Sequence, residues 1–241
     1  MRTTSSQDAL IRAARDLKLL AIQNRLPQDL DYRSGLSTVL LGRVSIWRGK
    51  VKAAALQIAF GHYSVQHDCA ALVARLLDKQ ALIYPFKPDK RDLKTNEIVY
   101  GKPDNKRPYE HKGFPAVVSC FFKGPNSIAE RVEAMFVRNS AGNLEASKSI
   151  VALACTGIWG VLDDYATGEH KPTDFDGSRV QDVYDVHIML LERLEAKNAE
   201  QYRTLMEDIF NTASRGSQFA KGVKVPTVQQ QEALSMLDWS D

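Results

Sequence analysis

The sequence has 241 residues, of which 44% are hydrophobic and 25% are charged, and its formal net charge is +3. This length allows one large domain or two smaller lobes, and the composition is that of a globular protein. We expect no membrane span, because no apolar run reaches the roughly 20 residues that a bilayer requires. The first residues lack the apolar segment of a signal peptide.

The three cysteines, Cys69, Cys120 and Cys155, are far apart, odd in number and set among apolar residues. This pattern indicates buried thiols in a reducing compartment rather than a disulfide framework. We therefore expect a cytoplasmic or otherwise intracellular protein, or a virion protein if the source is viral, and not a secreted one.

Hydrophobic periodicity predicts a mainly α protein of several helices, with a small β-hairpin and flexible terminal arms. We divide the chain into four ranges: an N-terminal helical arm (1–26), a basic helical lobe with the hairpin and a long basic loop (27–125), a helical core lobe (126–210), and a C-terminal linker and arm (211–241).

The first half of the chain contains three helical stretches. Apolar residues recur at helical spacing from Gln7 to Leu26, where Pro27 ends the helix. A second helix is predicted over Ser37–Trp47. The stretch Val51–Lys79 reads as a pair of helices, or as one helix broken near Gly61.

The helical period stops between Ala81 and Gly113, a segment with four prolines. Thr95–Tyr100 is predicted as a strand, and Ala116–Phe122 as its partner in a hairpin. The connecting loop, Gly101–Gly113, is rich in lysine and arginine. Loops of this length without structure of their own are usually functional or disordered.

The second half is organised around Ser147–Tyr165, whose inner part carries no charge from Ile150 to Leu162. We expect a helix buried on most sides, which other helices approach closely at Gly157 and Gly160. A capping box at Ser127 predicts a helix before it. A helix that begins near Ser178 and bends near Asn198 is predicted after it.

The charge is uneven along the chain. Residues 1–140 hold 23 Lys and Arg against 13 Asp and Glu, a net of +10, whereas residues 141–201 hold 5 against 11, a net of −6. Opposite charge in two parts of one chain indicates either a surface for polyanions or head-to-tail association. Solvated surface charge is the alternative explanation.

The basic part supplies the candidate site. Cations that lie outside the apolar stripes, with one tyrosine among them, suit a phosphate backbone and unpaired bases. The candidate nucleic-acid-binding residues are Arg48, Lys50, Lys52, Lys102, Lys106, Arg107, Tyr109, Arg131 and Arg138. We expect sequence-nonspecific binding of single-stranded nucleic acid, RNA first, by a homo-oligomer that assembles through its terminal arms as nucleocapsid or coat proteins do.

Two alternatives stay open. The chain is also consistent with a helical protein-interaction module without nucleic acid. The adjacent carboxylates Asp163 and Asp164 are typical of a helix end that holds Mg²⁺ against a phosphate or diphosphate, as in a magnesium-dependent enzyme. No Walker A loop, Rossmann fingerprint or Gly-x-Ser-x-Gly motif is present, so we assign no catalytic residue, no metal site and no cofactor.

Overall fold

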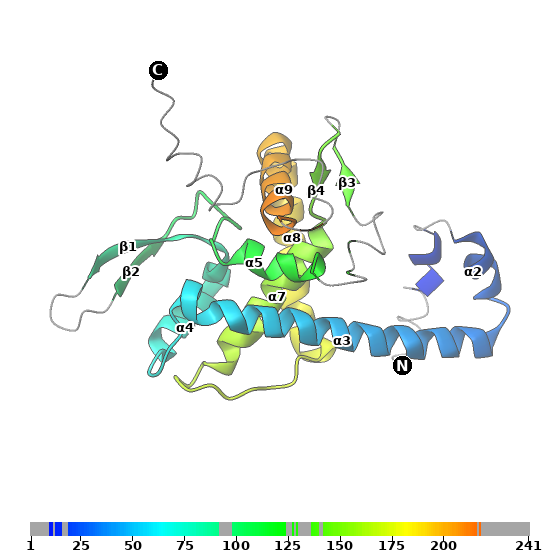
Figure 1. Cartoon of the computed structure of the whole chain (residues 1–241), viewed down its shortest axis with the longest axis horizontal. Helices are drawn as coiled ribbons and strands as arrows, with labels where there is room; N and C mark the ends of the chain where they lie inside the picture. Colours follow the sequence, from blue (N-terminus) through cyan, green and yellow to red (C-terminus); the bar gives the residue numbers. More distant parts are fainter. Residues whose placement is uncertain are drawn as a thin grey trace, which may run out of the picture.

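The computed structural model describes residues 10–11, 13–15, 19–91, 98–123, 127, 129, 136–139, 142–215 and 217. It confirms a mainly helical fold with only short strands (Figure 1). In the part described, no helix has the length and apolar content needed to cross a bilayer. The predicted helix over 127–138 falls largely outside the described residues, as does most of the C-terminal arm.

The longest element is α3 (Leu30–Tyr63), which joins two predicted helices into one of 34 residues. Its N-cap Asp29 accepts a hydrogen bond from the Tyr32 backbone N–H, and the left-handed Ser64 (φ 51°) ends it. The interruption that we predicted between Trp47 and Val51 is absent, because Gly49 is tolerated inside the helix at a cost of about 1 kcal/mol.

The N-terminal arm differs from the prediction in one respect. Instead of one helix that reaches Leu26, the short helix α2 (Leu20–Arg25) begins after the non-helical Leu19 (ψ 70°). Figure 1 shows α2 beside the first turns of α3. Arg25 forms an ion pair with Asp29 at 2.8 Å and lies over the Tyr32 ring, so this corner is fixed by local contacts.

After α3, the helix α4 (Ala70–Leu77) and the 3-10 helix η1 (Asp78–Ile83) lead into a two-stranded sheet. Its strands are β1 (Phe86–Arg91) and β2 (Ile98–Pro103), which pair antiparallel with Phe86 opposite Pro103. The prediction of a β-hairpin in this region was therefore correct. The strand that pairs with β2, however, is β1, which precedes β2 in the chain, and not the segment that follows β2.

The segment predicted as the partner strand is helical. It forms α5 (Phe114–Val118) and the 3-10 helix η2 (Ser119–Phe121), and the buried residues Phe114, Val117, Val118 and Phe121 follow a helical period. Pro115 at the start of α5 favours this outcome, since its φ is already helical. The prediction of a strand over Ala116–Phe122 was wrong, because the helical spacing of the apolar residues becomes visible only when Phe114 is included.

The remaining elements form the body. A short sheet of β3 (Val137–Arg138) and β4 (Leu144–Glu145) precedes three helices: α7 (Lys148–Asp164), α8 (Gly177–Lys197) and α9 (Ala199–Ala213). The predicted bend at Asn198 is confirmed: its side chain caps α9 by accepting from the Gln201 backbone N–H.

The predicted central helix is confirmed. In α7, capped by Ser147, most residues between Ile150 and Leu162 are buried, and α3 and α8 pack against it. One hydrophobic cluster extends from Val51 to Ala213 and draws on both predicted lobes, 27–125 and 126–210. Gly157 allows α3 to pack closely against α7, because a Cβ at this position would lie 2.6 Å from Val51. Gly160 instead faces Phe175 of the following loop.

Candidate functional site

The basic stretch of α3 from Trp47 to Lys52 is divided by the turn of the helix. Trp47 and Arg48 line a pocket against the body of the protein, and the Lys50 ammonium lies over the Trp47 ring, 4.4 Å from its centroid. Lys52 points to the opposite end of the α7 interface, where it contacts Asp164. Four residues within six helix positions thus lie in three different surroundings.

The pocket has a volume of about 310 Å³ and lies between α3, η2, α7 and α8. Trp47 stacks on Phe121 with a centroid distance of 6.5 Å and nearly parallel planes. The lining residues are Val44, Trp47, Arg48, Phe121, Ser149, Ile150, Leu153, Thr156, Gly177, Val180, Gln181 and Tyr184. Such a concave, mostly aromatic and aliphatic surface with a few polar groups is typical of a ligand site.

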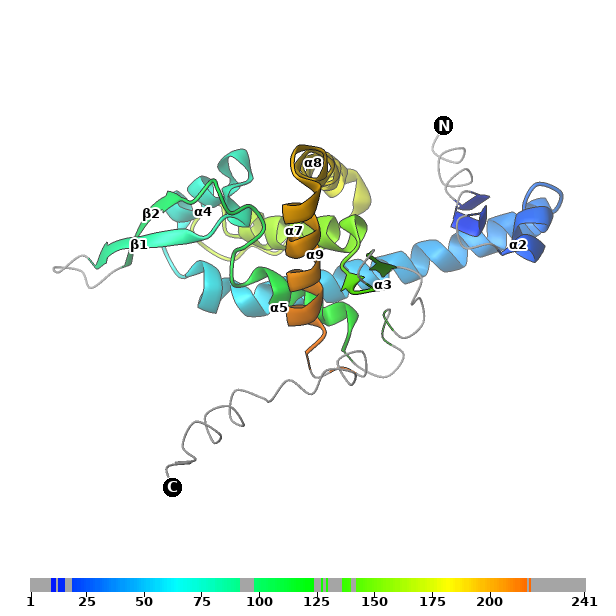
Figure 2. The ribbon, with the colours of Figure 1, turned by 90° about the horizontal axis from the view of Figure 1, so that it is seen from above.

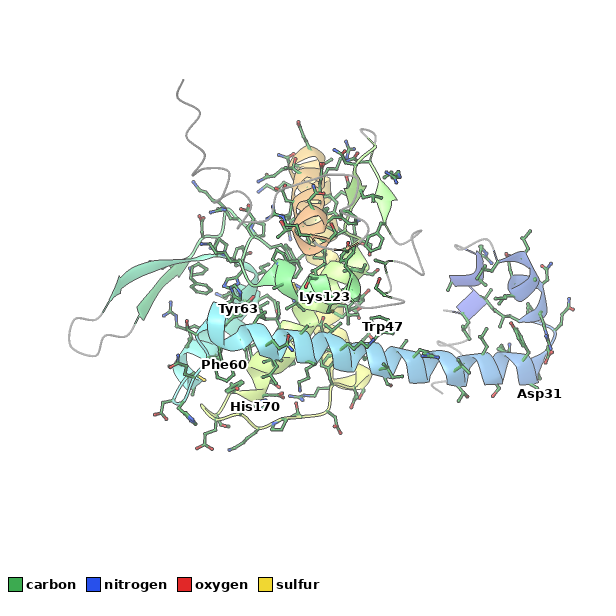
Figure 3. All side chains as sticks on the ribbon, in the orientation of Figure 1. Asp31, Trp47, Phe60, Tyr63, Lys123 and His170 are labelled. Atoms are coloured by element: carbon green, nitrogen blue, oxygen red, sulfur yellow. The ribbon has the colours of Figure 1, made fainter. Side chains whose placement is uncertain are left out.

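The cation Arg48 lines this pocket, and Lys50 lies over the Trp47 ring at its edge. The Arg48 guanidinium packs against Gly177, where a Cβ would lie 2.8 Å from one of its nitrogens. Burial raises the pKa of the Cys120 thiol to about 12, while the charges of Lys123 and Lys50 act in the opposite direction, which places both ammonium groups near Cys120. In Figure 3 the labels of Trp47 and Lys123 stand near each other, above the middle of α3.

Arg48 also lies near the start of α8. Hydrogen bonds from the Ser178 hydroxyl and from the backbone N–H groups of Arg179 and Ser178 lower the pKa of Asp176, and the charge of Arg48 adds to this effect. Asp176 is the N-cap of α8 and therefore stays ionised. The Arg48 guanidinium thus lies near an ionised carboxylate, which offsets part of its positive charge.

The basic loop after β2 forms a second surface. Lys102, Lys106 and Arg107 are exposed, and Arg107 is paired with Glu110 at 2.6 Å. Lys106 lines a groove of about 780 Å³ between this loop and the α8–α9 corner. These three cations lie together in the chain, but none of them lines the Trp47 pocket.

Tyr109 occupies a different position from the one predicted for it. Its side chain is only 1% exposed, and its hydroxyl lies 3.2 Å from Nδ1 of His187. The ring packs edge-on against Phe114 and His187, so it belongs to the core and offers no face to a base. We therefore leave Tyr109 out of the site that we propose.

The last two candidates lie near the short sheet. Arg138 is exposed in β3 and donates to the Gly142 carbonyl at 3.0 Å, where it closes the β3–β4 turn. Arg131 lies outside the described residues. Among the nine candidates, the structure thus brings Arg48 and Lys50 together at Trp47, whereas Lys102 lies in β2 and Lys106 and Arg107 lie in the loop that follows it.

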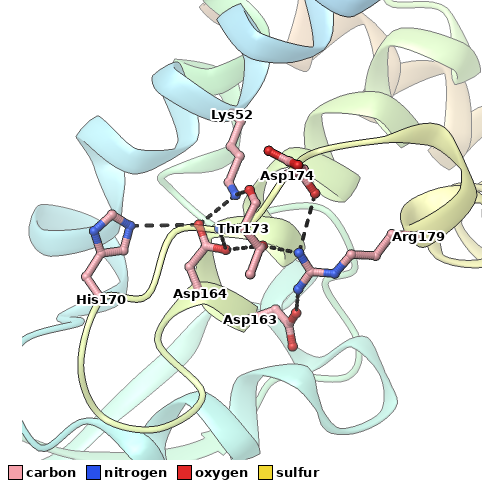
Figure 4. Close-up of polar contacts among 7 residues, drawn as sticks. All are labelled: Lys52, Asp163, Asp164, His170, Thr173, Asp174 and Arg179. Carbon is pink, nitrogen blue, oxygen red and sulfur yellow. Dashed lines mark hydrogen bonds and ion pairs between the residues drawn. The ribbon is translucent and has the colours of Figure 1, made fainter.

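The two aspartates of the magnesium alternative belong to a polar cluster at the end of α7 (Figure 4). Asp164 is buried; it pairs with Lys52 at 2.6 Å and accepts hydrogen bonds from the Thr173 hydroxyl and backbone N–H. Asp163 pairs with Arg179, which also donates to Thr173. His170 approaches Asp164 at 3.8 Å.

This cluster has the character of a structural clamp. Each carboxylate has its own cation, and Lys52 also donates to the Thr173 carbonyl at 2.7 Å, which ties α3 to the loop between α7 and α8. Across the described ranges, no three His, Cys, Asp or Glu side chains are placed to share a metal ion. We therefore do not carry the magnesium alternative forward.

Phe121 and Tyr184, which line the Trp47 pocket, were not among the residues predicted for the site, and neither was Lys123, which does not line it. Tyr184 was visible as part of the apolar face of its helix, and Phe121 as part of an apolar run. Neither signal says which other helix shares the pocket. Lys123 stands alone after that run, and only the packing of η2 against α3 brings it close to Lys50.

Comparison with known proteins gives one match. A family model described as a domain of unknown function, DUF6532, matches residues 2–194, which include α3, the Trp47 pocket, the basic loop and most of α8. No curated protein and no solved structure matches the chain. The matched residues make up most of the chain, and the protein therefore belongs to the DUF6532 family.

Proposed function

We propose that this protein binds single-stranded nucleic acid, RNA in the first instance, without reading its sequence, and that several copies coat one strand. The observation that carries the proposal is the Trp47 pocket: the stacked rings of Trp47 and Phe121 line it together with Arg48, and the Lys50 ammonium lies over the Trp47 ring. The three free thiols suit a reducing, intracellular compartment for this activity.

The chemistry of the pocket matches one unpaired nucleotide. Every base has a π face, so stacking on Trp47 or Tyr184 is worth about 1–3 kcal/mol per base whatever the base is. The ammonium groups of Lys50 and Lys123 would neutralise the neighbouring phosphates. Because base stacking and phosphate contacts do not read the edges of the bases, we expect little discrimination between sequences.

The loop cations extend the same electrostatic surface. Lys102 and Lys106 are exposed, and the Arg107–Glu110 ion pair is exposed enough to exchange for a phosphate contact at little cost. Lys52 is excluded from this role, since its ammonium is held by Asp164 and the Thr173 carbonyl. Arg138 and Arg131 would contribute only as additional, separate contacts.

The test is a salt titration of affinity for a single-stranded RNA of mixed sequence, followed by fluorescence anisotropy. We compare the parent with Lys50→Ala/Lys123→Ala and with Lys106→Ala/Arg107→Ala. Each double variant should bind more weakly and lower the slope of log K against log salt by about 1.4, since each phosphate contact contributes about 0.7 on single strands. Unrelated sequences should be affected equally.

The matched control is Arg193→Ala/Arg203→Ala, which removes the same charge from exposed positions of α8 and α9. It should leave the salt slope at the parent value. A parent protein that does not bind even in low salt overturns the function. If a double variant binds like the parent at every salt concentration, its two substituted residues are not part of the binding site.

A second candidate function is a helical interaction module that binds no nucleic acid. It is favoured by the apolar side chains that α3 exposes, among them Val39 (59% exposed) and Ile46 (53% exposed). The absorbance ratio at 260 and 280 nm, measured on protein purified without nuclease, separates the two. Copurifying nucleic acid supports the coat function, and nucleic-acid-free protein that also ignores added RNA supports the interaction module.

A further inference from the structure

The outer half of α3 buries little of its surface against the rest of the described chain: Val44, Trp47 and Arg48 meet the body, and α2 lies beside its first turns. No described side chain between residues 30 and 50 is buried, whereas Val51, Ala55, Ile58 and Tyr63 of the same helix are. Figure 2 shows this half extending from the body, with α2 and the blue ribbon pieces that precede it at its far end. Amphipathic helices derive most of their stability from packing one face, so the exposed apolar side chains of this half are available to a partner.

The outward face of this half carries a stripe of Val39, Arg43 and Ile46, which we call the arm stripe. These residues are spaced four and three apart, so they lie on one side of the helix. All three are exposed, and the two aliphatic side chains keep more than half of their surface accessible. Among the exposed large apolar side chains of the described residues, most lie between Leu19 and Ile46.

The second surface is the outward face of α8. Asp182, Asp185, Met189 and Glu192 line up at helical spacing opposite the buried Val180, His187 and Leu191. Met189 is 60% exposed with a carboxylate one turn away on either side. We call these four residues the α8 stripe. None of the ion pairs within the described ranges involves its carboxylates or Arg43.

The two stripes are the inverse of each other. The arm stripe has a cation between two aliphatic groups, and the α8 stripe has an apolar side chain between two carboxylates, with the same spacing of four and three. Met189 placed between Val39 and Ile46 would bring Arg43 within reach of Asp185 and Glu192. The net charges of the longer segments have matching signs: +10 for residues 1–140, which contain the arm stripe, and −6 for residues 141–201, which contain the α8 stripe.

We infer that the arm stripe of one copy docks on the α8 stripe of a second copy. Each copy would then keep one free arm and one free α8 face. Because the two surfaces are different, this contact is heterologous, and it generates a ring or an open filament rather than a closed pair. This inference does not depend on nucleic acid, and it adds to the proposed function the surfaces through which copies meet.

The test uses charge reversal in the full chain after nuclease treatment, with light scattering over a concentration series. The parent mass should rise above twice the 26.9 kDa of one chain. Arg43→Glu alone and Asp185→Lys/Glu192→Lys alone should each remain at the monomer mass. A chain that carries all three changes should associate again, because the two surfaces are complementary once more.

The control is Arg203→Glu, a charge reversal at an exposed position of α9 outside both stripes, which should associate like the parent. A parent that stays monomeric at every concentration overturns the inference. So does growth of the Asp185→Lys/Glu192→Lys variant like the parent, which would point to α3 pairing with α3. Failure of the combined variant to regain association, while its circular dichroism and thermal transition match the parent, also overturns it.

Discussion

Gly157 lies where α7 and α3 approach each other most closely in the core. Its missing side chain leaves room for Val51, whose carbonyl oxygen would lie 3.4 Å from an added Cβ and whose Cγ1 would lie closer still. A methyl group at this point must displace part of α3. Gly49, two residues before Val51 on α3, has nothing within 4 Å of its own Cβ position.

The two glycines give opposite predictions for the same substitution. Gly157→Ala should lower the free energy of unfolding by about 1–3 kcal/mol, because it overpacks a filled interface. Gly49→Ala should raise it by about 0.5–1 kcal/mol, because it reduces the entropy lost by an exposed helical residue. Urea unfolding measures both. Equal effects of the two substitutions would mean that α3 and α7 are not packed at Val51.

At the scale of elements, the loop between α7 and α8 is attached to α3 through one ion pair. The Asp164 side chain is 1% exposed and that of Lys52 is 16% exposed. Their contact also orders Thr173, which bonds to both partners. The pair was invisible in the sequence, where Lys52 resembles the other cations of its stretch and Asp164 resembles a metal ligand.

We expect Lys52→Met to lower the free energy of unfolding by about 3 kcal/mol, because it leaves a buried carboxylate without its cation. The double variant Lys52→Met/Asp164→Leu should recover part of this loss. As a control, Glu195→Gln breaks the more exposed Lys148–Glu195 pair and should cost less than about 1 kcal/mol. Similar losses for Lys52→Met and Glu195→Gln in urea unfolding would contradict the clamp.

For the molecule as a whole, two buried histidines make stability depend on pH. Burial lowers the pKa of His187 to about 4, and burial together with the charge of His62 lowers the pKa of His111 to about 4. His187 contacts the Tyr109 hydroxyl, and His111 stacks on Tyr63 at 4.1 Å. Both rings lie where the basic loop joins the core, so they become accessible only when the body unfolds.

These shifts have a definite sign. Between pH 6.5 and 4 the unfolded chain binds more protons than the folded one, so the free energy of unfolding falls as the pH is lowered through this window. Each histidine should contribute a loss of about 3 kcal/mol across it. His187→Leu should remove one of the two contributions and flatten the profile measured by urea unfolding. A parent whose stability is unchanged between pH 6.5 and 4 would contradict this account.

Local signals in the sequence were enough for the helical class, the central helix and the bend at Asn198, because capping residues and a period of 3.6 act over a few turns. They failed for the hairpin partner, since strand pairing joins residues that no local period relates. They also failed for α3, because the low helix propensity of Gly49 is compatible both with a loop and with a glycine inside a continuous helix.

The same division holds for the candidate site. The sequence by itself determined which residues carry charge and that the basic ones precede the acidic ones. Only the tertiary structure decided that Lys52 pairs with Asp164, that Tyr109 is buried, and that Arg48 shares a pocket with Phe121 and Tyr184. The physical reason is that burial and ion pairing depend on distances between helices, which are set by side-chain packing across elements far apart in the chain.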